Sequence, residues 1–179
     1  MIKKLALHSP LDATEKAVLQ RLPHNLTRVE RNAVLVRDGG SPTKCALLLS
    51  GFAYRNKVTG DGARQILSVH LKGDLVDLQN CLLSTADHAV QALTEINVAY
   101  IPHSAILDAA AAHPGIAQAL WRDSLIDASI FREWILNVGR RDARQRISHL
   151  LCELALRQEA AGLCRAEGSS ICFVVAQGD

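Results

Sequence analysis

The sequence lacks any apolar run of the roughly 18 residues that a membrane-spanning helix needs. Its first residues, Met1 to Leu5, carry charge but no apolar stretch that could form the central region of a signal peptide. These absences predict a cytoplasmic protein with no membrane partner. The formal net charge of +2 gives no overall basic surface for a polyanion, so a nucleic-acid role would need a local patch.

Enzyme signatures are also missing. No glycine-rich phosphate loop opens a helix, and no G-x-S-x-G nucleophile elbow occurs. The seven histidines are scattered, without the H-x-H or H-x3-H pairs of metal sites, which favours surface or interface positions for each of them. We therefore predict no catalytic residue, no metal site and no cofactor. A cupin-like enzyme would become an alternative if the purified protein carried stoichiometric metal.

The cysteines are odd in number and include no C-x-x-C pair. In a reducing compartment such residues are usually small buried hydrophobes. A redox sensor or an iron–sulfur ligand set would need clustered thiolates, and the wide spacing predicts no cluster. The residues concerned are Cys45, Cys81, Cys152, Cys164 and Cys172.

A capped helix is predicted near the start of the chain. Ser9 offers an N-cap, Pro10 the first helical position and Asp12 a carboxylate three residues after the cap. Pro23 ends this segment. From about residue 29 to residue 102, short apolar or alternating runs are separated by glycines, and residues 59–62 read as a hairpin turn. Strands at this spacing, without intervening helices, predict an antiparallel sandwich or barrel.

After Pro102, Ser104 is expected to cap a short helix that continues through Ala112. A proline-free stretch then follows Pro114 as far as Gly139, and it carries a heptad-like seam about 25 residues long. We interpret the seam as the interface of a two-fold homodimer; the alternative is one amphipathic helix lying on its own barrel. The predicted interface residues are Ala117, Trp121, Ser124, Ala128, Phe131, Ile135 and Val138.

A second amphipathic helix is predicted from about Asp142, with Gly162 as its stop. Four arginines gather where the two helices meet: Arg140, Arg141, Arg144 and Arg146. A solvent-facing helix start explains them, and proximity to a nucleic-acid-binding appendage is the alternative. A second basic group, Arg55, Lys57 and Arg64, flanks the hairpin turn and is interpreted as part of a solvated loop.

This order of elements resembles the Crp/Fnr superfamily of bacterial transcription regulators, over residues 9 to about 165. Residues 71–78 are similar to the "pGD" entry of the family's ligand cassette, residues 87–93 to the strand that closes it, and residues 139–147 to the hinge. The resemblance implies a mainly β fold with helices. It would be an antiparallel jelly-roll barrel of the cyclic-nucleotide-binding type (residues 1–113), a long dimerisation helix (114–139) and the start of a C-terminal region (140–179).

Several positions depart from the family pattern. The Gly-Glu pair of cyclic-AMP-binding members is replaced by Asp77-Leu78, and their Arg followed by Ser or Thr by His88-Ala89. A histidine does not replace the bidentate arginine fork, so cyclic-AMP binding of the usual kind is not expected. The N-terminal cysteine cluster of the iron–sulfur members is also absent. The candidate ligand-binding residues implied by the resemblance are Asp77, Leu78, Gln79, His88, Ala89, Phe131 and Arg132.

Family members continue into a winged helix-turn-helix that reads DNA. Residues 168–179 do not resemble the family's lead into that domain, which is predicted to be missing here. The predicted function is therefore the effector-sensing and dimerisation module of a Crp/Fnr-type regulator. Its small-molecule effector is unidentified, and DNA contact would come through the missing domain. The alternative is a stand-alone dimeric interaction protein that does not bind DNA.

Overall fold

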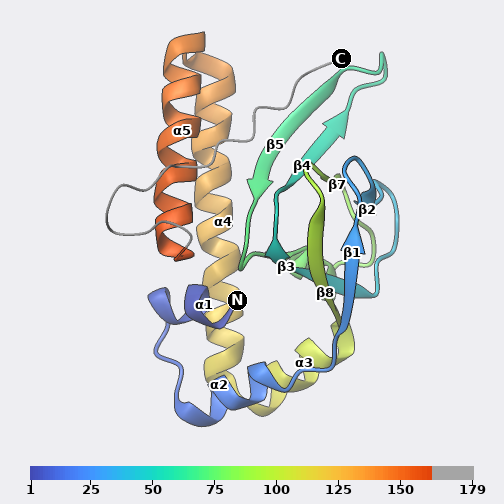
Figure 1. The fold of residues 1–179 in the computed structure, drawn as a ribbon, viewed down its shortest axis with the longest axis vertical. Helices are drawn as coiled ribbons and strands as arrows, with labels where there is room; N and C mark the ends of the chain where they lie inside the picture. Colours follow the sequence, from blue (N-terminus) through green and yellow to red (C-terminus); the bar gives the residue numbers. More distant parts are fainter. Residues whose placement is uncertain (163–179) are drawn as a thin grey trace.

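A computed structural model describes residues 1–162 as a barrel of two four-stranded sheets followed by long helices (Figure 1). Every strand pairing is antiparallel, which confirms the predicted jelly-roll class. The first sheet has the order β1-β8-β3-β6, with β1 Asn25–Val29, β8 Ile96–Pro102, β3 Lys44–Ser50 and β6 Leu75–Val76. The second has the order β2-β7-β4-β5, with β2 Val34–Val36, β7 Ala89–Ala92, β4 Ala53–Val58 and β5 Arg64–His70.

The predicted hairpin turn joins β4 to β5. Thr59 N donates to Ala63 O at 2.9 Å, and Gly62 takes a φ of 87°, a conformation that glycine adopts without steric cost. The barrel interior is filled by inward-facing side chains from both sheets, including Leu48, Val90 and Val98. A second apolar cluster lies where helices cover the end of the barrel, around Ile101, Ile106 and Ile116.

The N-terminal helices differ from the prediction. A helix that the sequence did not indicate, α1, spans Ile2–His8, and α2 spans Ala13–Gln20. The predicted cap at Ser9 is wrong, because Asp12 caps α2 through a reciprocal capping box with Glu15. Glu15 N donates to Asp12 Oδ1 at 2.7 Å and Asp12 N to Glu15 Oε2 at 2.9 Å. This box satisfies two backbone N–H groups, whereas a serine hydroxyl would satisfy one.

The C-terminal helices follow the prediction closely. After α3 (His103–Ala112), which has no side-chain cap and so does not use Ser104, α4 runs from Pro114 to Arg140. Asp142 caps α5 (Ala143–Ala160), and Gly162 follows with a φ of 69°. Figure 1 shows that α5 turns back beside α4. Trp134 Nε1 donates to Glu153 at 2.7 Å across this pair of helices.

Within residues 1–162, no helix is long and apolar enough to cross a membrane. The predictions about the tail, including those for Cys164, Cys172 and residues 168–179, lie outside the described residues. The domain boundaries proposed from the sequence stay predictions.

Candidate functional site

A cavity of about 700 Å³ lies between the β4–β5 hairpin, the short 3-10 helix η1 (Leu78–Cys81) and α4. Four of the seven candidate ligand residues line it: Leu78, Gln79, His88 and Phe131. Its other lining residues include Arg55, Ile66, Trp134 and Val138. A mostly apolar wall with a few polar groups is typical of small-molecule sites.

Asp77 lies beneath this cavity and is 1% exposed. Its carboxylate accepts from Asn80 Nδ2 at 2.9 Å and Gln79 Nε2 at 3.3 Å, and lies 2.7 Å from His88 Nε2. The Asp77 backbone has a φ of 66°, in the left-handed region that favours glycine and tolerates aspartate. A glycine, which the family resemblance places at this position, would adopt the same conformation without steric cost.

His88 is buried, so its predicted placement at a surface or interface is wrong. Its Nδ1 lies 2.6 Å from Asp87 Oδ1, while its Nε2 faces Asp77. The hydrogen bond to His88 lowers the pKa of Asp87. Both ring nitrogens already contact carboxylates, so His88 joins Asp77 and Asp87 in a cluster beneath the cavity, which we call the cavity floor. His88 therefore does not present a free nitrogen to a ligand.

Arg55 is the cavity residue that sequence reasoning missed. The sequence predicts a solvated loop at Arg55, but this residue lies in β4 with its side chain 8% exposed. Its guanidinium sits 3.7 Å from Asp77 Oδ1 and 5.1 Å from the centre of the Phe131 ring. Within residues 1–162 its Nε has no hydrogen-bond partner. Burial lowers the pKa of Arg55, and the nearby carboxylate of Asp77 opposes this effect.

No periodicity in the sequence marks this residue. Residues 53–56 of β4 are all buried, so both faces of this half of the strand are covered and burial does not alternate there. Lys57 and Arg64 are exposed, as predicted.

The remaining sequence candidates lie elsewhere. Ala89 begins β7 outside the cavity lining, and the exposed Arg132 donates from Nη2 to Ser129 Oγ at 2.9 Å. Part of the predicted dimer seam faces the barrel, because Ser124, Phe131, Ile135 and Val138 also line the cavity. The other seam residues lie outside that lining: Ala117, Trp121 and Ala128.

At the hinge, Arg141 contacts Glu133 at 3.0 Å and donates to Asn137 Oδ1 at 2.9 Å. Arg140 and Arg144 are exposed, in agreement with the interpretation as a solvent-facing helix start.

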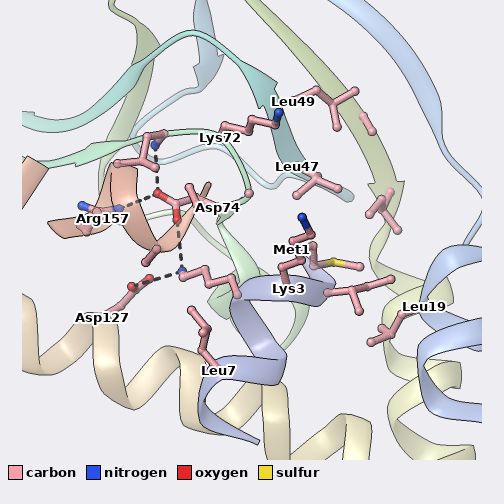
Figure 2. Close-up of a pocket in the computed structure, with 18 of the residues that line it drawn as sticks. Met1, Lys3, Leu7, Leu19, Leu47, Leu49, Lys72, Asp74, Asp127 and Arg157 are labelled. Atoms are coloured by element: carbon pink, nitrogen blue, oxygen red, sulfur yellow. Dashed lines mark hydrogen bonds and ion pairs between the residues drawn. The ribbon is translucent and has the colours of Figure 1, made fainter. Parts of the chain in front are cut away.

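A second cavity, of about 500 Å³, lies between α1, the β1-β8-β3 sheet and the end of α5 (Figure 2). At its edge the buried Asp74 carboxylate contacts Arg157 Nη2 at 2.6 Å and Lys4 Nζ at 3.2 Å, and accepts from Leu71 N at 3.0 Å. Burial raises the pKa of Asp74. Arg157, His70 and Lys4 lower it by more, so that it lies well below its usual range. These ion pairs attach both α1 and α5 to the barrel.

Comparison with known proteins agrees with this geometry. Residues 26–113 match the cyclic nucleotide-binding domain family. The transcriptional activator protein FnrL of Cereibacter sphaeroides is 25% identical over 167 residues, which cover 93% of this chain and 66% of FnrL. The structure of FixK2 from Bradyrhizobium japonicum superposes with a TM-score of 0.73 at 21% identity, over 82% of this chain and 70% of FixK2.

The catabolite activator protein of Thermus thermophilus has the same fold, with a TM-score of 0.59 at 17% identity over 94% of this chain and 81% of that protein. The chain spans 50% to 66% of the length of the curated relatives it matches. Their names denote regulators and transcriptional activators, which supports the prediction that the chain is not an enzyme. Together the matches show that residues 26–113 form a domain of the cyclic nucleotide-binding type, and that most of the chain is similar to the N-terminal part of Fnr- and FixK-type regulators.

Proposed function

We propose that this chain senses an anionic small molecule in the cavity between its barrel and α4, as the sensing and dimerisation part of a transcription regulator. The proposal rests on the position and contacts of Arg55. It is a buried cation at the cavity wall that contacts Asp77 of the floor and Phe131 of α4. A ligand at this point would touch the barrel and the long helix together.

The chemistry of the cavity favours an acidic group attached to an apolar or planar body. The Arg55 guanidinium lies 3.7 Å from the Asp77 carboxylate, outside close hydrogen-bonding range, and among residues 1–162 its buried Nε has no hydrogen-bond partner. A carboxylate or phosphate would supply the missing acceptor through a charge-assisted bond. Phe131, Trp134 and Ile66 would cover the rest of the ligand. Both ring nitrogens of His88 contact carboxylates, and Ala89 has only a methyl side chain. These two features argue against cyclic-AMP binding of the usual kind.

The test is thermal unfolding against a panel of cyclic nucleotides, nucleotides and small dicarboxylates. We expect at least one anion to raise the stability, by about 2.7 kcal/mol at a hundred times its dissociation constant. Replacing Arg55→Gln should abolish that shift, since glutamine keeps polarity but removes the charge. The matched control is Arg64→Gln, an exposed arginine of the neighbouring strand, which should keep the shift. Stabilisation that survives in Arg55→Gln would show that the anion binds elsewhere.

We also propose that α4 pairs with α4 of a second copy. Helix α5 contacts the face of α4 that carries Trp134 and Asn137. Another face stays exposed and apolar, with Trp121 at 69% exposure and Leu125 and Leu136 beside it. Ile135 borders both this face and the cavity, because it lines the cavity and is still 73% exposed. Exposed apolar side chains repeated along one helix are typical of a helix–helix interface. DNA binding would then be a property of the longer regulator to which such a dimer belongs.

Replacing Trp121→Glu should weaken the dimer by at least about 2 kcal/mol, or roughly 30-fold in dissociation constant, because a buried interface tryptophan is usually an energetic hot spot. Sedimentation velocity over a dilution series measures the change. The control is Leu82→Glu, since Leu82 is an even more exposed apolar residue, at 84%, and lies outside α4. A monomeric wild type, or equal weakening by both substitutions, would contradict the proposed interface.

A further inference from the structure

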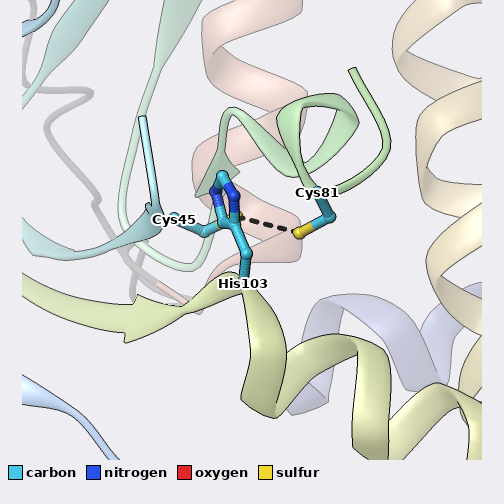
Figure 3. A group of neighbouring side chains, drawn as sticks. All are labelled: Cys45, Cys81 and His103. Carbon is cyan, nitrogen blue, oxygen red and sulfur yellow. Dashed lines mark hydrogen bonds between the residues drawn. The ribbon is translucent and has the colours of Figure 1, made fainter. Parts of the chain in front are cut away.

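Two cysteines and a histidine meet on the side of η1 away from α4 (Figure 3). Cys45 comes from β3, Cys81 ends η1, and His103 stands at the junction of β8 and α3. The two sulfurs are 3.6 Å apart, and one ligand atom of each residue lies within 4.8 Å of the other two. The prediction that the cysteines form no cluster is therefore wrong, because β3 and η1 bring residues 36 positions apart into contact.

The spacing of these atoms suits a tetrahedral metal ion. With zinc–sulfur bonds of about 2.3 Å, two thiolates on one ion lie about 3.8 Å apart. The observed 3.6 Å is close to this value and well above the roughly 2.05 Å of a disulfide. A reduced pair awaiting oxidation would also show such a separation, so the third residue decides between the two interpretations.

That third residue is His103. Its Nε2 is buried and, within the part of the chain that the structure describes, has no hydrogen-bond partner. A buried imidazole nitrogen without a partner costs free energy unless something binds it. A disulfide between the cysteines would not involve the imidazole, whereas a metal ion held by both sulfurs and a ring nitrogen would use all three residues.

Charge also favours a divalent ion. Cys45 is fully buried, and a lone thiolate there would be poorly solvated. When an ion of charge +2 binds, both thiols lose their protons to solvent, and the two thiolates and a neutral imidazole leave the site with no net charge. Cys81 and His103 are partly exposed, which gives the ion a path from solvent.

We propose that Cys45, Cys81 and His103 bind a thiophilic divalent transition metal ion of the zinc class. Three protein ligands leave a fourth position for water or another small ligand, as in open zinc sites. The ion would join β3, η1 and the start of α3 at one point. This proposal is independent of the effector proposed for the neighbouring cavity.

The probe is Co²⁺, followed by competition with Zn²⁺, on the whole chain purified under reducing conditions. We expect one Co²⁺ per chain, with d–d bands of tetrahedral coordination and a thiolate-to-cobalt charge-transfer band that Zn²⁺ removes. Cys81→Ser should reduce the charge-transfer band to about half, in line with one sulfur ligand in place of two. His103→Gln should keep both thiolates but raise the Co²⁺ dissociation constant by more than roughly 100-fold. Loss of a residue that only hydrogen-bonds to a metal ligand costs roughly 10- to 100-fold in affinity, so a larger effect indicates direct coordination.

The matched control replaces the three other cysteines with serine: Cys152→Ser, Cys164→Ser and Cys172→Ser. This variant should bind Co²⁺ with an unchanged spectrum. Thermal unfolding without metal shows whether each variant is folded, and a folded Cys81→Ser or His103→Gln that binds like wild type would overturn the proposal. So would a wild type that binds no Co²⁺ at millimolar concentration, or one whose Cys45 and Cys81 form a disulfide in place of binding metal.

Discussion

Replacing Asp77→Ala should destabilise the chain by about 3–5 kcal/mol, the usual cost of removing one partner from a buried ion pair. The substitution leaves the buried Arg55 guanidinium without its nearest carboxylate, and it removes the acceptor that faces His88 Nε2 and Asn80 Nδ2. It also places alanine at a φ of 66°, which aspartate tolerates better. Urea unfolding monitored by circular dichroism measures the loss.

Asp87→Ala is the matched control for this prediction. Asp87 contacts the other nitrogen of the same imidazole, at 2.6 Å, but its side chain is 84% exposed. Water can replace an exposed carboxylate, so we expect a change within about 1 kcal/mol. Equal losses in the two variants would show that His88, and not the buried Arg55–Asp77 pair, sets the stability of the cavity floor.

Replacing Asp74→Asn should cost a similar amount, about 3–5 kcal/mol, since Asp74 holds two cations, Arg157 and Lys4, at the edge of the second cavity. The folded-state pKa of Asp74 lies below its unfolded value, so its stabilising effect is present above the unfolded pKa. That effect is lost as the pH falls through the folded pKa. Asp74→Asn should therefore lower the free energy of unfolding at neutral pH. It should also remove most of the decrease in that free energy that the wild type shows as the pH falls.

Two further measurements identify the source of that loss. Hydrogen exchange should increase in α5, which Arg157 attaches to the barrel, and little in β3 or β8. In a double-mutant cycle, Arg157→Met with Asp74→Asn should cost less than the sum of the single substitutions, because the double variant no longer holds a charged Arg157 without its Asp74 partner. Asp127→Asn is the control, since Asp127 lies 3.9 Å from Lys4 and is partly exposed. Additive losses would contradict a direct Arg157–Asp74 interaction.

Local patterns were enough to predict most elements of this fold. Glycines between short apolar runs indicated the antiparallel strands, Pro114 and Gly139 marked the ends of the long helix, and the amphipathic pattern from about Asp142 indicated α5. The start of α2 was misplaced because two capping signals lie three residues apart, and the choice between Ser9 and Asp12 depends on the reciprocal bond that Glu15 adds.

The candidate site was predicted only in part, because its charges pair across long distances in the sequence. The family resemblance located Asp77 and His88, but Arg55 reaches Asp77 across 22 positions from a strand read as solvated. Likewise Cys45 and Cys81 are brought together by the register of β3 with β6, which no single-strand periodicity reveals. Such partners become visible once the pairing of the strands is known.

The strand β6 consists of two buried residues, Leu75 and Val76, and it separates two carboxylates that face different neighbours. Asp77, on one side, holds the cation of the cavity wall, and Asp74, on the other, holds α5 through Arg157. A segment this short and tightly packed has little room to deform. If an anion drew Arg55 away from Asp77, the shortest chain path from that carboxylate to the ion pair that holds α5 would be residues 74–77, and not the length of α4.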